Sequence, residues 1–463
     1  MTQPPKTPDT FDVAVIGAGV VGIATARALA ALGQRVVVLE KGTDLLSGAS
    51  KANSAILHTG FDAPPGSLEA QCVRRGHALY MQEHARYRLG VVKTGALVVA
   101  WDAGQAAHLQ KIAAQALENE VTDIALLSPE EVAKREPNLA PGQHGAVWVP
   151  QEYLIDPWTP FYAYAREAQI AGAQFRFDSP LTGGAFDGAT WTLETPTDRV
   201  NARQVVNCAG LFGDYVEALC LGQASFEIRP RKGQFVVFDK AAAALVNAIL
   251  LPVPNERTKG IVLTRTAFGN LLVGPTAEEQ EDRERPTTSR AMLEELVARA
   301  VEMVPRLAGM DITATYAGLR PASEEKPYRI RHEPDRHWLT LGGIRSTGMT
   351  ASLGLAEYAA ELLLGQRPPY VPPEERMPAL IEGAPRDWQS PGYGEILCHC
   401  EMVTRREVEA ALQSPLPPRS PGGLRRRTRC AMGRCQGFNC FGALAEITDQ
   451  RLPHPFPGAK PCK

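Results

Sequence analysis

The segment that most constrains the fold of this chain is residues 11–41, FDVAVIGAGVVGIATARALAALGQRVVVLEK. A short apolar run suited to a buried strand breaks into G-A-G-V-V-G before a helical pattern, and a second apolar run then ends in an acidic residue. The first glycine permits a tight turn, the second lets a pyrophosphate approach the backbone, and the third lets the helix lie close to the strand. The acidic residue can accept hydrogen bonds from ribose hydroxyls. We therefore predict a β-α-β dinucleotide site with contacts at Gly17, Gly19, Val20, Val21, Gly22, Glu40 and Lys41.

A membrane anchor is the alternative interpretation, because residues 13–31 are mostly apolar and about as long as a membrane span. The internal glycines, Arg27 and the strand that follows argue against an anchor. We expect no integral membrane segment.

Length and charge set broad limits on the function. A chain of 463 residues can bury a large core and should divide into two or three domains. The net charge of −2 gives no reason to expect nucleic acid as a partner. Residues 1–10 lack the apolar core of a signal peptide, so we expect a cytoplasmic protein. Peripheral contact with the inner membrane stays open, because reduction of a quinone would need such contact or a second subunit.

Six of the nine cysteines lie near the C-terminus, at Cys398, Cys400, Cys430, Cys435, Cys440 and Cys462. In a reducing compartment such clustering indicates a metal rather than disulfides. A C-x-C and a C-x-x-x-x-C motif would supply four thiolates, which suit zinc or a [2Fe-2S] cluster, and the spacing alone does not choose between them. For the basic run at residues 425–429 we predict a solvated face that also tempers the negative charge of such a cluster; binding to an acidic surface is the alternative.

The loop after residue 41 carries N-S-x-I-L-H-x-G-x-D at residues 53–62, followed by P-G-S-L at residues 65–68. This pattern resembles the flavin-dependent oxidoreductases of the D-amino-acid oxidase superfamily. Within them it is most similar to the branch of FAD-dependent glycerol-3-phosphate dehydrogenases and L-2-hydroxyglutarate oxidases. The resemblance implies that the dinucleotide is FAD and that this loop passes the isoalloxazine ring. It makes Ser50, Asn53 and Ser54 cofactor contacts and places His58 near the flavin.

Two later glycine turns are similar to further FAD contacts of the family. An N-C-A-G element at residues 207–210 ends a buried strand, and L-T-L-G-G-I-R-S-T-G-M-T at residues 339–350 runs from a strand into a helix. The second helix would face the flavin edge where reduction deposits negative charge. The resemblance implies cofactor contacts at Ala209, Gly210, Gly343, Ile344, Gly348, Met349 and Thr350.

The cysteine region also resembles a known domain. V-T-x-x-E follows the C-x-C motif, and T-R-x-x-M-G-x-C-Q-G-x-x-C spans residues 428–440. Both resemble the bacterioferritin-associated-ferredoxin-like domain, which holds a [2Fe-2S] cluster and occurs at the C-terminus of related oxidoreductases. The resemblance implies Cys398, Cys400, Cys435 and Cys440 as the ligands, although Cys430 is close enough in sequence to substitute for one of them.

Together these patterns predict an α/β chain with a Rossmann-type FAD-binding domain, a mixed α+β substrate domain and a small C-terminal [2Fe-2S] domain. The expected boundaries are residues 9–80, 145–220 and 310–365 for the FAD-binding domain, 81–144 and 221–309 for the substrate domain, 366–390 for a proline-rich linker and 391–453 for the [2Fe-2S] domain. We also expect a strand over residues 175–181.

A flavin oxidises an alcohol or an amine by accepting hydride at N5 while a base removes the other proton. His58 has a suitable pKa range for a catalytic base, and a structural histidine bonded to the backbone is the alternative. Arg320, in Y-A-G-L-R-P, resembles the family arginine that holds the phosphate or carboxylate of the substrate, and a plain salt bridge is the alternative. Weaker candidates for the same anionic pocket are Arg345, Arg265 and Lys232, which are otherwise surface or structural charges.

We therefore predict an FAD-dependent dehydrogenase of a small anionic hydroxy substrate, with glycerol 3-phosphate first and an L-2-hydroxy acid such as 2-hydroxyglutarate next. Electrons would leave through the [2Fe-2S] cluster to an acceptor protein or a quinone-linked subunit. An amino-acid or amine dehydrogenase of the opine, proline or sarcosine type is one alternative. Another is a flavin and iron–sulfur protein that transfers electrons or senses redox state without an organic substrate of its own.

Overall fold

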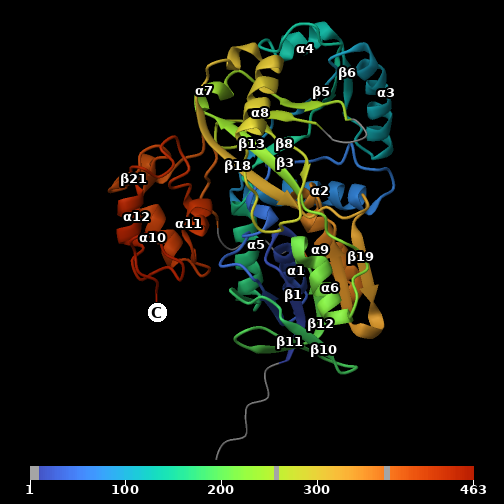
Figure 1. The fold of residues 1–463 in the computed structure, drawn as a ribbon, viewed down its shortest axis with the longest axis vertical. Coiled ribbons are helices and arrows are strands. Elements are labelled where there is room, and N and C mark those ends of the chain that lie inside the picture. The colour runs from blue at the N-terminus through green and yellow to red at the C-terminus, as the bar shows by residue number, and fades with distance from the viewer. Residues whose placement is uncertain (1–9, 255–259, 370–375, 463) are drawn as a thin grey trace, which may run out of the picture.

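The computed structural model describes residues 10–254, 260–369 and 376–462. Figure 1 shows three parts: a half around β1, α1 and β12, a half around β5, β13 and α8, and a small C-terminal part beside them. The fold is the mixed α/β arrangement predicted from the sequence.

The first half is built on a sheet of eight strands with β1 (Thr10–Ile16) near its centre. β2 (Val36–Leu39) and β12 (Arg199–Asn207) flank β1 in parallel, β9 (Gln174–Arg176) follows β2, and β20 (Trp338–Gly342) pairs in parallel with β12. The remaining strands are antiparallel: β10 (Gly183–Phe186), β11 (Trp191–Glu194) and β19 (Arg329–Glu333). The strand expected over residues 175–181 therefore ends earlier, because Asp178 adopts a left-handed backbone with φ of 53° and Pro180 follows.

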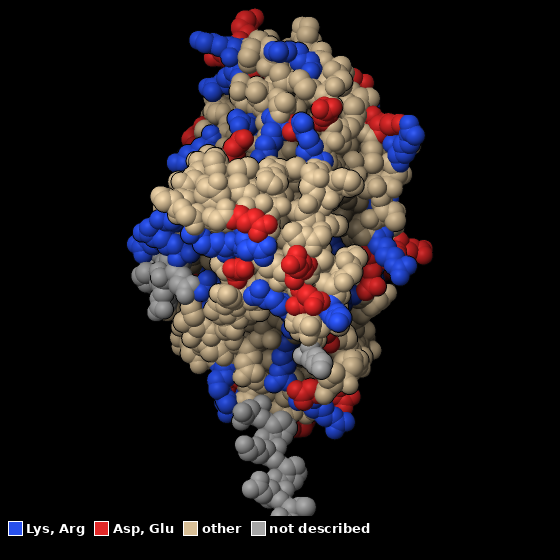
Figure 2. Space-filling model, turned by 90° about the vertical axis from the view of Figure 1, so that its left-hand side faces the viewer, with Lys and Arg blue, Asp and Glu red and all other residues tan. Residues whose placement is uncertain are grey.

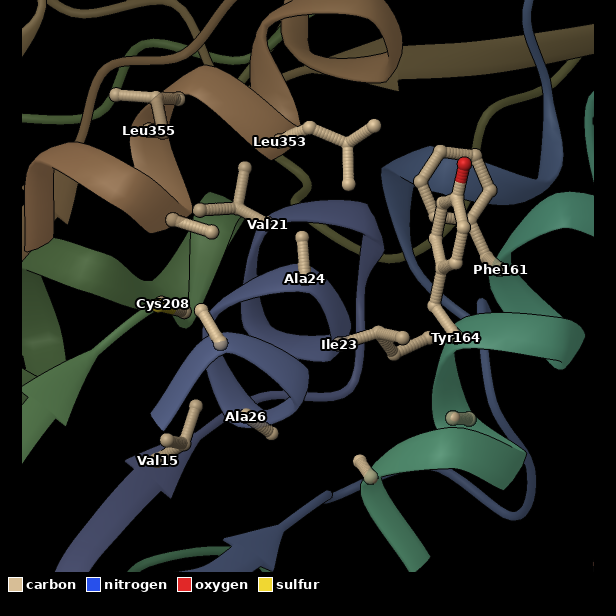
Figure 3. Close-up of a cluster of buried hydrophobic side chains, with 14 of the residues drawn as sticks. Val15, Val21, Ile23, Ala24, Ala26, Phe161, Tyr164, Cys208, Leu353 and Leu355 are labelled. Atoms are coloured by element: carbon tan, nitrogen blue, oxygen red, sulfur yellow. The ribbon is translucent and has the colours of Figure 1, made fainter. Parts of the chain in front are cut away.

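Helices cover this sheet, and nine of the twelve residues of α1 (Val20–Ala31) are buried. Figure 3 shows Val21, Ile23 and Ala24 of α1 between α5 (Thr159–Ile170) and α9 (Gly348–Leu364). A helix that packs against neighbours on several sides needs an almost wholly apolar sequence. This explains why the sequence of α1 is similar to that of a membrane span. Within the described ranges, none of the helices is both long and apolar enough to cross a bilayer. Two further helices of this half are α2 (Leu68–Tyr87) and α6 (Gly213–Leu221).

The second half is built on a sheet of nine strands, in which β13 (Arg231–Phe238) pairs antiparallel with β18 (Ile312–Arg320). The other strands are β5 (Ala96–Val99), β6 (Ala125–Leu127), β7 (Ala146–Val149), β14 (Ile249–Pro252), β15 (Val262–Arg265), β16 (Leu271–Gly274) and β17 (Glu278–Glu279). The helices of this half are α3 (Ala103–Glu118), α4 (Pro129–Arg135), α7 (Lys240–Ala243) and α8 (Arg290–Met303). Because β7 and β18 belong to this sheet, it reaches into two segments that we expected to serve only the FAD-binding domain.

A three-stranded sheet in the order β3 (Ile56–Leu57), β8 (Tyr153–Ile155) and β4 (Val91–Val92) lies between these halves in sequence and in space.

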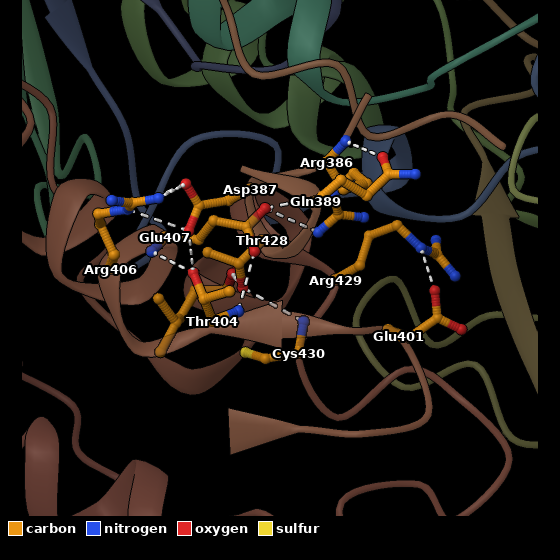
Figure 4. A network of polar contacts seen from close by, with 11 residues as sticks. Arg386, Asp387, Gln389, Glu401, Thr404, Arg406, Glu407, Thr428, Arg429 and Cys430 are labelled. Carbon is orange, nitrogen blue, oxygen red and sulfur yellow. Dashed lines mark hydrogen bonds and ion pairs between the residues drawn. The ribbon is translucent and has the colours of Figure 1, made fainter. Parts of the chain in front are cut away.

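The C-terminal part, which we call the cysteine module, comprises residues 391–462. It lies on the left in Figure 1, and Figure 2 shows the molecule from that side. It contains β21 (Ile396–Cys398), β22 (Val403–Thr404), α10 (Arg405–Gln413), α11 (Pro421–Thr428) and α12 (Phe441–Ile447) around a small apolar core of its own. Figure 4 shows that Arg386 and Asp387, at the end of the expected linker, bind Glu407, Thr404 and Arg406 of the module. This end of the linker is thus fixed to the module.

Candidate functional site

A cavity of about 720 Å³ runs from the glycine turn of β1 and α1 to the ends of β13 and β18. Its wall includes most of the residues predicted as cofactor contacts: Gly17, Gly19, Val20, Val21, Glu40, Lys41, Ser50, Asn53, Ser54, Ala209, Gly210, Ile344, Gly348 and Met349. The sheet topology explains this convergence, because β1, β2, β12 and β20 are parallel and so end at the same edge.

The glycines of the turn differ in what they permit. A Cβ atom on Gly17 would lie 2.7 Å from the Cys208 carbonyl oxygen, and one on Gly22 would lie 1.9 Å from the Gly17 carbonyl oxygen. Both glycines are therefore required by packing, and Gly22 does not line the cavity. A Cβ atom on Gly19 would instead lie 3.1 Å from the Ser50 hydroxyl oxygen, on the cavity side. The missing side chain of Gly19 keeps the start of α1 accessible to an anion from the cavity side, where the Val20 amide donates to the Ser50 hydroxyl oxygen at 3.1 Å.

Glu40 lies at the end of β2 and is buried. Its carboxylate accepts hydrogen bonds from the Ala18 amide at 2.6 Å and the Gly42 amide at 2.7 Å. Burial raises the pKa of this carboxyl, and the two amide bonds oppose the shift. Each oxygen of a carboxylate has a second acceptor position, so Glu40 can still accept from the hydroxyls of a ribose.

Two predicted cofactor contacts of the last turn lie outside the cavity wall. Gly343 has a φ of 65° and packs against Arg329, so it shapes the turn rather than the cavity. The Thr350 hydroxyl accepts the backbone N–H of His58 at 3.0 Å and so joins α9 to the loop after β3. Gly343 and Thr350 thus stabilise the backbone around the cavity and do not line it.

Arg320 ends β18 at the far end of the cavity and is a partly buried cation with no acidic partner within the described residues. Its guanidinium donates to the carbonyl oxygens of Thr276 at 2.7 Å and Lys232 at 3.4 Å, and its Nε atom has no partner. Burial, together with the charges of Arg231 and Arg345, lowers the pKa of Arg320 to about 10. An unpaired buried charge is costly, so this end of the cavity favours a bound anion.

Arg345 also lines the cavity, and it donates to the Lys326 carbonyl oxygen at 2.7 Å. Burial lowers its pKa as well. Arg231, which sequence reasoning missed, is the cross-strand neighbour of Arg320 and pairs with Glu279 at 3.2 Å. The basic start of its strand, R-P-R-K at residues 229–232, was the available signal.

Lys232 and Arg265 do not line the cavity, which corrects their assignment to the anionic pocket. The Lys232 ammonium pairs with Glu278 at 3.2 Å, and only its backbone carbonyl meets Arg320. Arg265 ends β15 and pairs with Glu382 at 3.5 Å. Both side chains form ion pairs within the fold, as the alternative interpretation of surface or structural charges expected.

His58 follows β3, and its Nδ1 atom lies 2.9 Å from a carboxylate oxygen of Glu152. Glu152 is completely buried and also accepts from the amide and the hydroxyl of Thr59. A carboxylate on Nδ1 fixes the orientation of the imidazole and directs its Nε2 atom to other partners. His58 is not part of the cavity wall, and Glu152 was missed because an acid in a turn between two apolar strands gives no signal of its own.

The predicted ligand cysteines come together in two contacting pairs, Cys398 with Cys440 and Cys400 with Cys435. Burial raises the pKa of Cys430 to about 12, and this thiol also lies close enough to Cys398 and Cys440 to sense their charge. No group of three or more His, Cys, Asp or Glu side chains within the described part of the chain has the geometry of a metal site. The donors are chemically those of an iron–sulfur or zinc site, but their positions do not define one.

The basic run at residues 425–429 is not the solvated face that we predicted. Arg426 and Arg429 are buried, and Arg426 donates to the Tyr162 hydroxyl at 3.1 Å and the Leu45 carbonyl at 3.0 Å. Arg427 binds both carboxylate oxygens of Asp44. Arg425 lies near Cys430 and Cys440, and its effect on the charge of a cluster stays a prediction. The run docks the module because a guanidinium can fit bidentate against a carboxylate of a neighbouring domain.

Comparison with known proteins agrees with this site. Residues 12–362 match the family model described as "FAD dependent oxidoreductase". The chain is 30% identical over 457 residues to a glycerol 3-phosphate dehydrogenase of Caloramator mitchellensis, covering 96% of this chain and 94% of that protein. It is 31% identical over 370 residues to a glycerol 3-phosphate oxidase of Mycoplasma pneumoniae, covering 77% of this chain and 95% of that protein.

Among solved structures, the chain is similar to the dithionite-reduced L-alpha-glycerophosphate oxidase of Mycoplasma pneumoniae with FAD bound. The TM-score is 0.74 at 28% identity, and the match covers 80% of this chain and 99% of that one.

Proposed function

This chain belongs to the family of FAD-dependent oxidoreductases, and we propose that it oxidises the hydroxyl-bearing carbon of a small anionic substrate. Glycerol 3-phosphate is the first candidate, and an L-2-hydroxy acid such as 2-hydroxyglutarate is the second. The observation that carries the proposal is Arg320, a partly buried cation at the cavity end whose hydrogen bonds within the described residues go to backbone carbonyls alone. The relatives named above as acting on glycerol 3-phosphate support the order of the candidates.

The proposed cofactor contacts follow the cavity from one end to the other. The amides of Gly19 and Val21, together with the Val20 amide once it leaves the Ser50 hydroxyl, would hold the pyrophosphate at the helix N-terminus. Glu40, an acceptor at a strand end, would hold the ribose. The loop of Ser50, Asn53 and Ser54 and the turn at Gly348 and Met349 would then border the isoalloxazine ring, with Ala209, Gly210 and Ile344 between them.

The chain's own residues divide the chemistry among them. When bound, FAD supplies the acceptor for the hydride that leaves the substrate carbon. Arg320 and Arg345 bind the anionic group and fix the orientation of the substrate. The proposed base is His58, whose Nδ1 atom Glu152 holds; because His58 lies outside the cavity wall, this role requires its Nε2 atom to reach the hydroxyl proton of the bound substrate. The N-terminus of α9 faces the cavity and favours negative charge there.

For the cysteine module we propose a [2Fe-2S] cluster held by Cys398, Cys400, Cys435 and Cys440, with Cys430 as a possible replacement ligand. Such a cluster would supply one-electron transfer to an acceptor protein or a quinone-linked subunit. The lengths of the relatives support this: the dehydrogenase matches nearly the whole chain, whereas the oxidase is matched over 370 residues, about the length of the family match. The module thus accompanies the protein named a dehydrogenase.

Anaerobic reduction of the flavin tests the substrate. Glycerol 3-phosphate, L-2-hydroxyglutarate, proline and sarcosine are each mixed with the enzyme without oxygen, and the bleaching of the flavin absorbance is followed. We expect glycerol 3-phosphate to bleach it fastest. Bleaching by the amines alone would establish an amine dehydrogenase, and bleaching only by a reduced protein donor would establish an electron-transfer protein.

Iron and acid-labile sulfide, assayed in protein purified without added metal, test the cluster. Equal amounts of the two support [2Fe-2S], and zinc without sulfide would replace it with a structural zinc site.

A further inference from the structure

The cysteine module is attached to the loop that borders the FAD cavity around a buried acid, Asp44, and Arg426 adds a hydrogen bond to the neighbouring Leu45 carbonyl at 3.0 Å. The Arg427 guanidinium binds the two oxygens of this carboxylate at 2.9 and 3.0 Å, and the Arg419 amide donates to it at 3.0 Å. Arg419 also donates from Nε to the Thr43 carbonyl at 3.1 Å. Asp44 is completely buried, so its charge is balanced almost wholly by residues of the module.

The loop that carries Asp44 is also part of the cofactor site. The Leu46 amide donates to the Ala18 carbonyl of the dinucleotide turn at 3.0 Å, and residues 47–54 line the cavity. None of the module's residues lines it. The module therefore acts on the cavity from behind its wall, through this loop and through Asp178, which the Arg419 guanidinium binds at 3.0 Å and which precedes the cavity-lining Ser179.

A second contact joins the same loop to the module. The Lys51 carbonyl accepts from the Trp158 indole at 3.3 Å, and Trp158 stacks on Phe268 with ring centroids 5.8 Å apart. The Arg429 guanidinium lies 3.7 Å from the centroid of the Phe268 ring. Both ends of the loop, at Asp44 and at Lys51, are thus connected to residues 419–429 of the module.

We propose that docking of the cysteine module and binding of FAD are coupled, with Asp44 as the positioning residue that transmits the coupling. With the module docked, Arg427 and Arg419 hold Asp44, and the loop keeps the conformation that borders the cavity. When the module leaves, Asp44 is a buried carboxylate without its cations, and the loop must rearrange to hydrate it. The coupling is reciprocal by thermodynamic necessity, so FAD must tighten the docking by the factor by which docking tightens FAD.

The approach of α11 to Asp44 provides a sharp test. A Cβ atom on Gly423 would lie 1.8 Å from an Asp44 carboxylate oxygen, whereas one on the adjacent Gly422 would meet the far end of the Arg426 side chain at 3.3 Å and the Ser420 hydroxyl at 3.9 Å. Gly423→Ala should therefore push the module off the loop, and Gly422→Ala is its matched control. Asp44→Asn tests the same contact from the other side.

FAD binding to the full-length apoprotein is measured by quenching of flavin fluorescence. We expect Gly423→Ala and Asp44→Asn to raise the Kd for FAD about tenfold, within the usual range of coupling between sites, and Gly422→Ala to leave it unchanged. Circular dichroism of each variant is the control that checks whether it is folded. A wild-type Kd in both test variants would overturn the proposal.

Hydrogen exchange of the wild-type chain supplies a second measurement that needs no variant. Adding FAD should slow exchange in residues 419–429 and leave α12, inside the module, unchanged. Equal exchange of residues 419–429 with and without FAD would overturn the proposal. Equal slowing of α12 would also overturn it, because FAD would then be stabilising the fold of the module and not its docking. Neither measurement needs a substrate or a cluster, so failure of the proposed function leaves this test intact.

Discussion

Arg320 and Arg427 are both largely removed from solvent, and their surroundings are opposite. Arg320 donates to two backbone carbonyls, and its pKa is lowered to about 10 by burial. Burial also acts to lower the pKa of Arg427, but the interactions of this side chain with Tyr162 and Asp44 are stronger, and the pKa of Arg427 is raised. Arg320 therefore has no anionic partner within the described residues, whereas Arg427 forms an ion pair with Asp44.

The presence or absence of an acidic partner distinguishes an arginine that holds two parts of the fold together from one that can bind a ligand. A buried ion pair that is complete in the folded chain has little affinity left for a ligand. A buried guanidinium that the fold leaves without an acid gains more from a phosphate or carboxylate than an exposed one would, because the anion removes an existing cost. The two arginines look alike in the sequence, and only their partners distinguish them.

Arg320→Met gives the largest expected effect on activity. Loss of a buried charged partner of the substrate should lower kcat/KM about a thousandfold, which corresponds to about 4 kcal/mol. The free energy of unfolding should stay the same or rise, because an unpaired buried charge is removed. Steady-state kinetics and denaturant unfolding measure the two quantities. A variant with normal KM, or one that is strongly destabilised, would contradict the assignment of Arg320 to the substrate anion.

Arg427→Met should have the opposite profile. It leaves Asp44 buried and unpaired, so we expect the free energy of unfolding to fall by about 3 kcal/mol. The exposed pair of Arg367 and Glu361, 3.1 Å apart, provides the control: Arg367→Met should cost less than about 1 kcal/mol. Equal losses in Arg320→Met and Arg427→Met would show that the two sites do not differ.

Inorganic phosphate sharpens the comparison further. At ten times its Kd it should stabilise the wild-type protein by about 1.4 kcal/mol, read as a rise in the melting temperature. Arg320→Met should abolish this rise, while Arg427→Met should melt lower but keep it. Stabilisation that persists in Arg320→Met would place the anion elsewhere.

Two weaker candidates give the smallest expected effects. Arg345→Met should raise KM about tenfold, because this side chain lines the cavity and carries positive charge near Arg320. Arg265→Met should leave KM unchanged, since Arg265 pairs with Glu382 outside the cavity. A raised KM in Arg265→Met would restore it to the anionic pocket.

The parts of the site that the sequence predicted are those that local rules dictate. The turn from Gly17 to Gly22 and the acid at Glu40 follow from what one strand, one turn and one helix require. Arg231, Glu152 and the docking of residues 425–429 depend on strand register or on contact between distant segments. A run of basic residues predicts a solvated surface when its acidic partner is unknown. The partner of the run at residues 425–429 is Asp44, which lies near the other end of the sequence.

The pairing of β20 with β12, and the packing of α9 on α1, have a consequence for folding during synthesis. β1 and α1 leave the ribosome early, but the strand and the helix that complete their surroundings are among the last elements of the family domain to be made. The apolar faces of α1 must therefore wait for most of the chain to be translated, a period in which chaperones can bind them. Ribosome-bound chains that end before α9 should accordingly fail to retain FAD, whereas chains that extend through α9 should begin to do so.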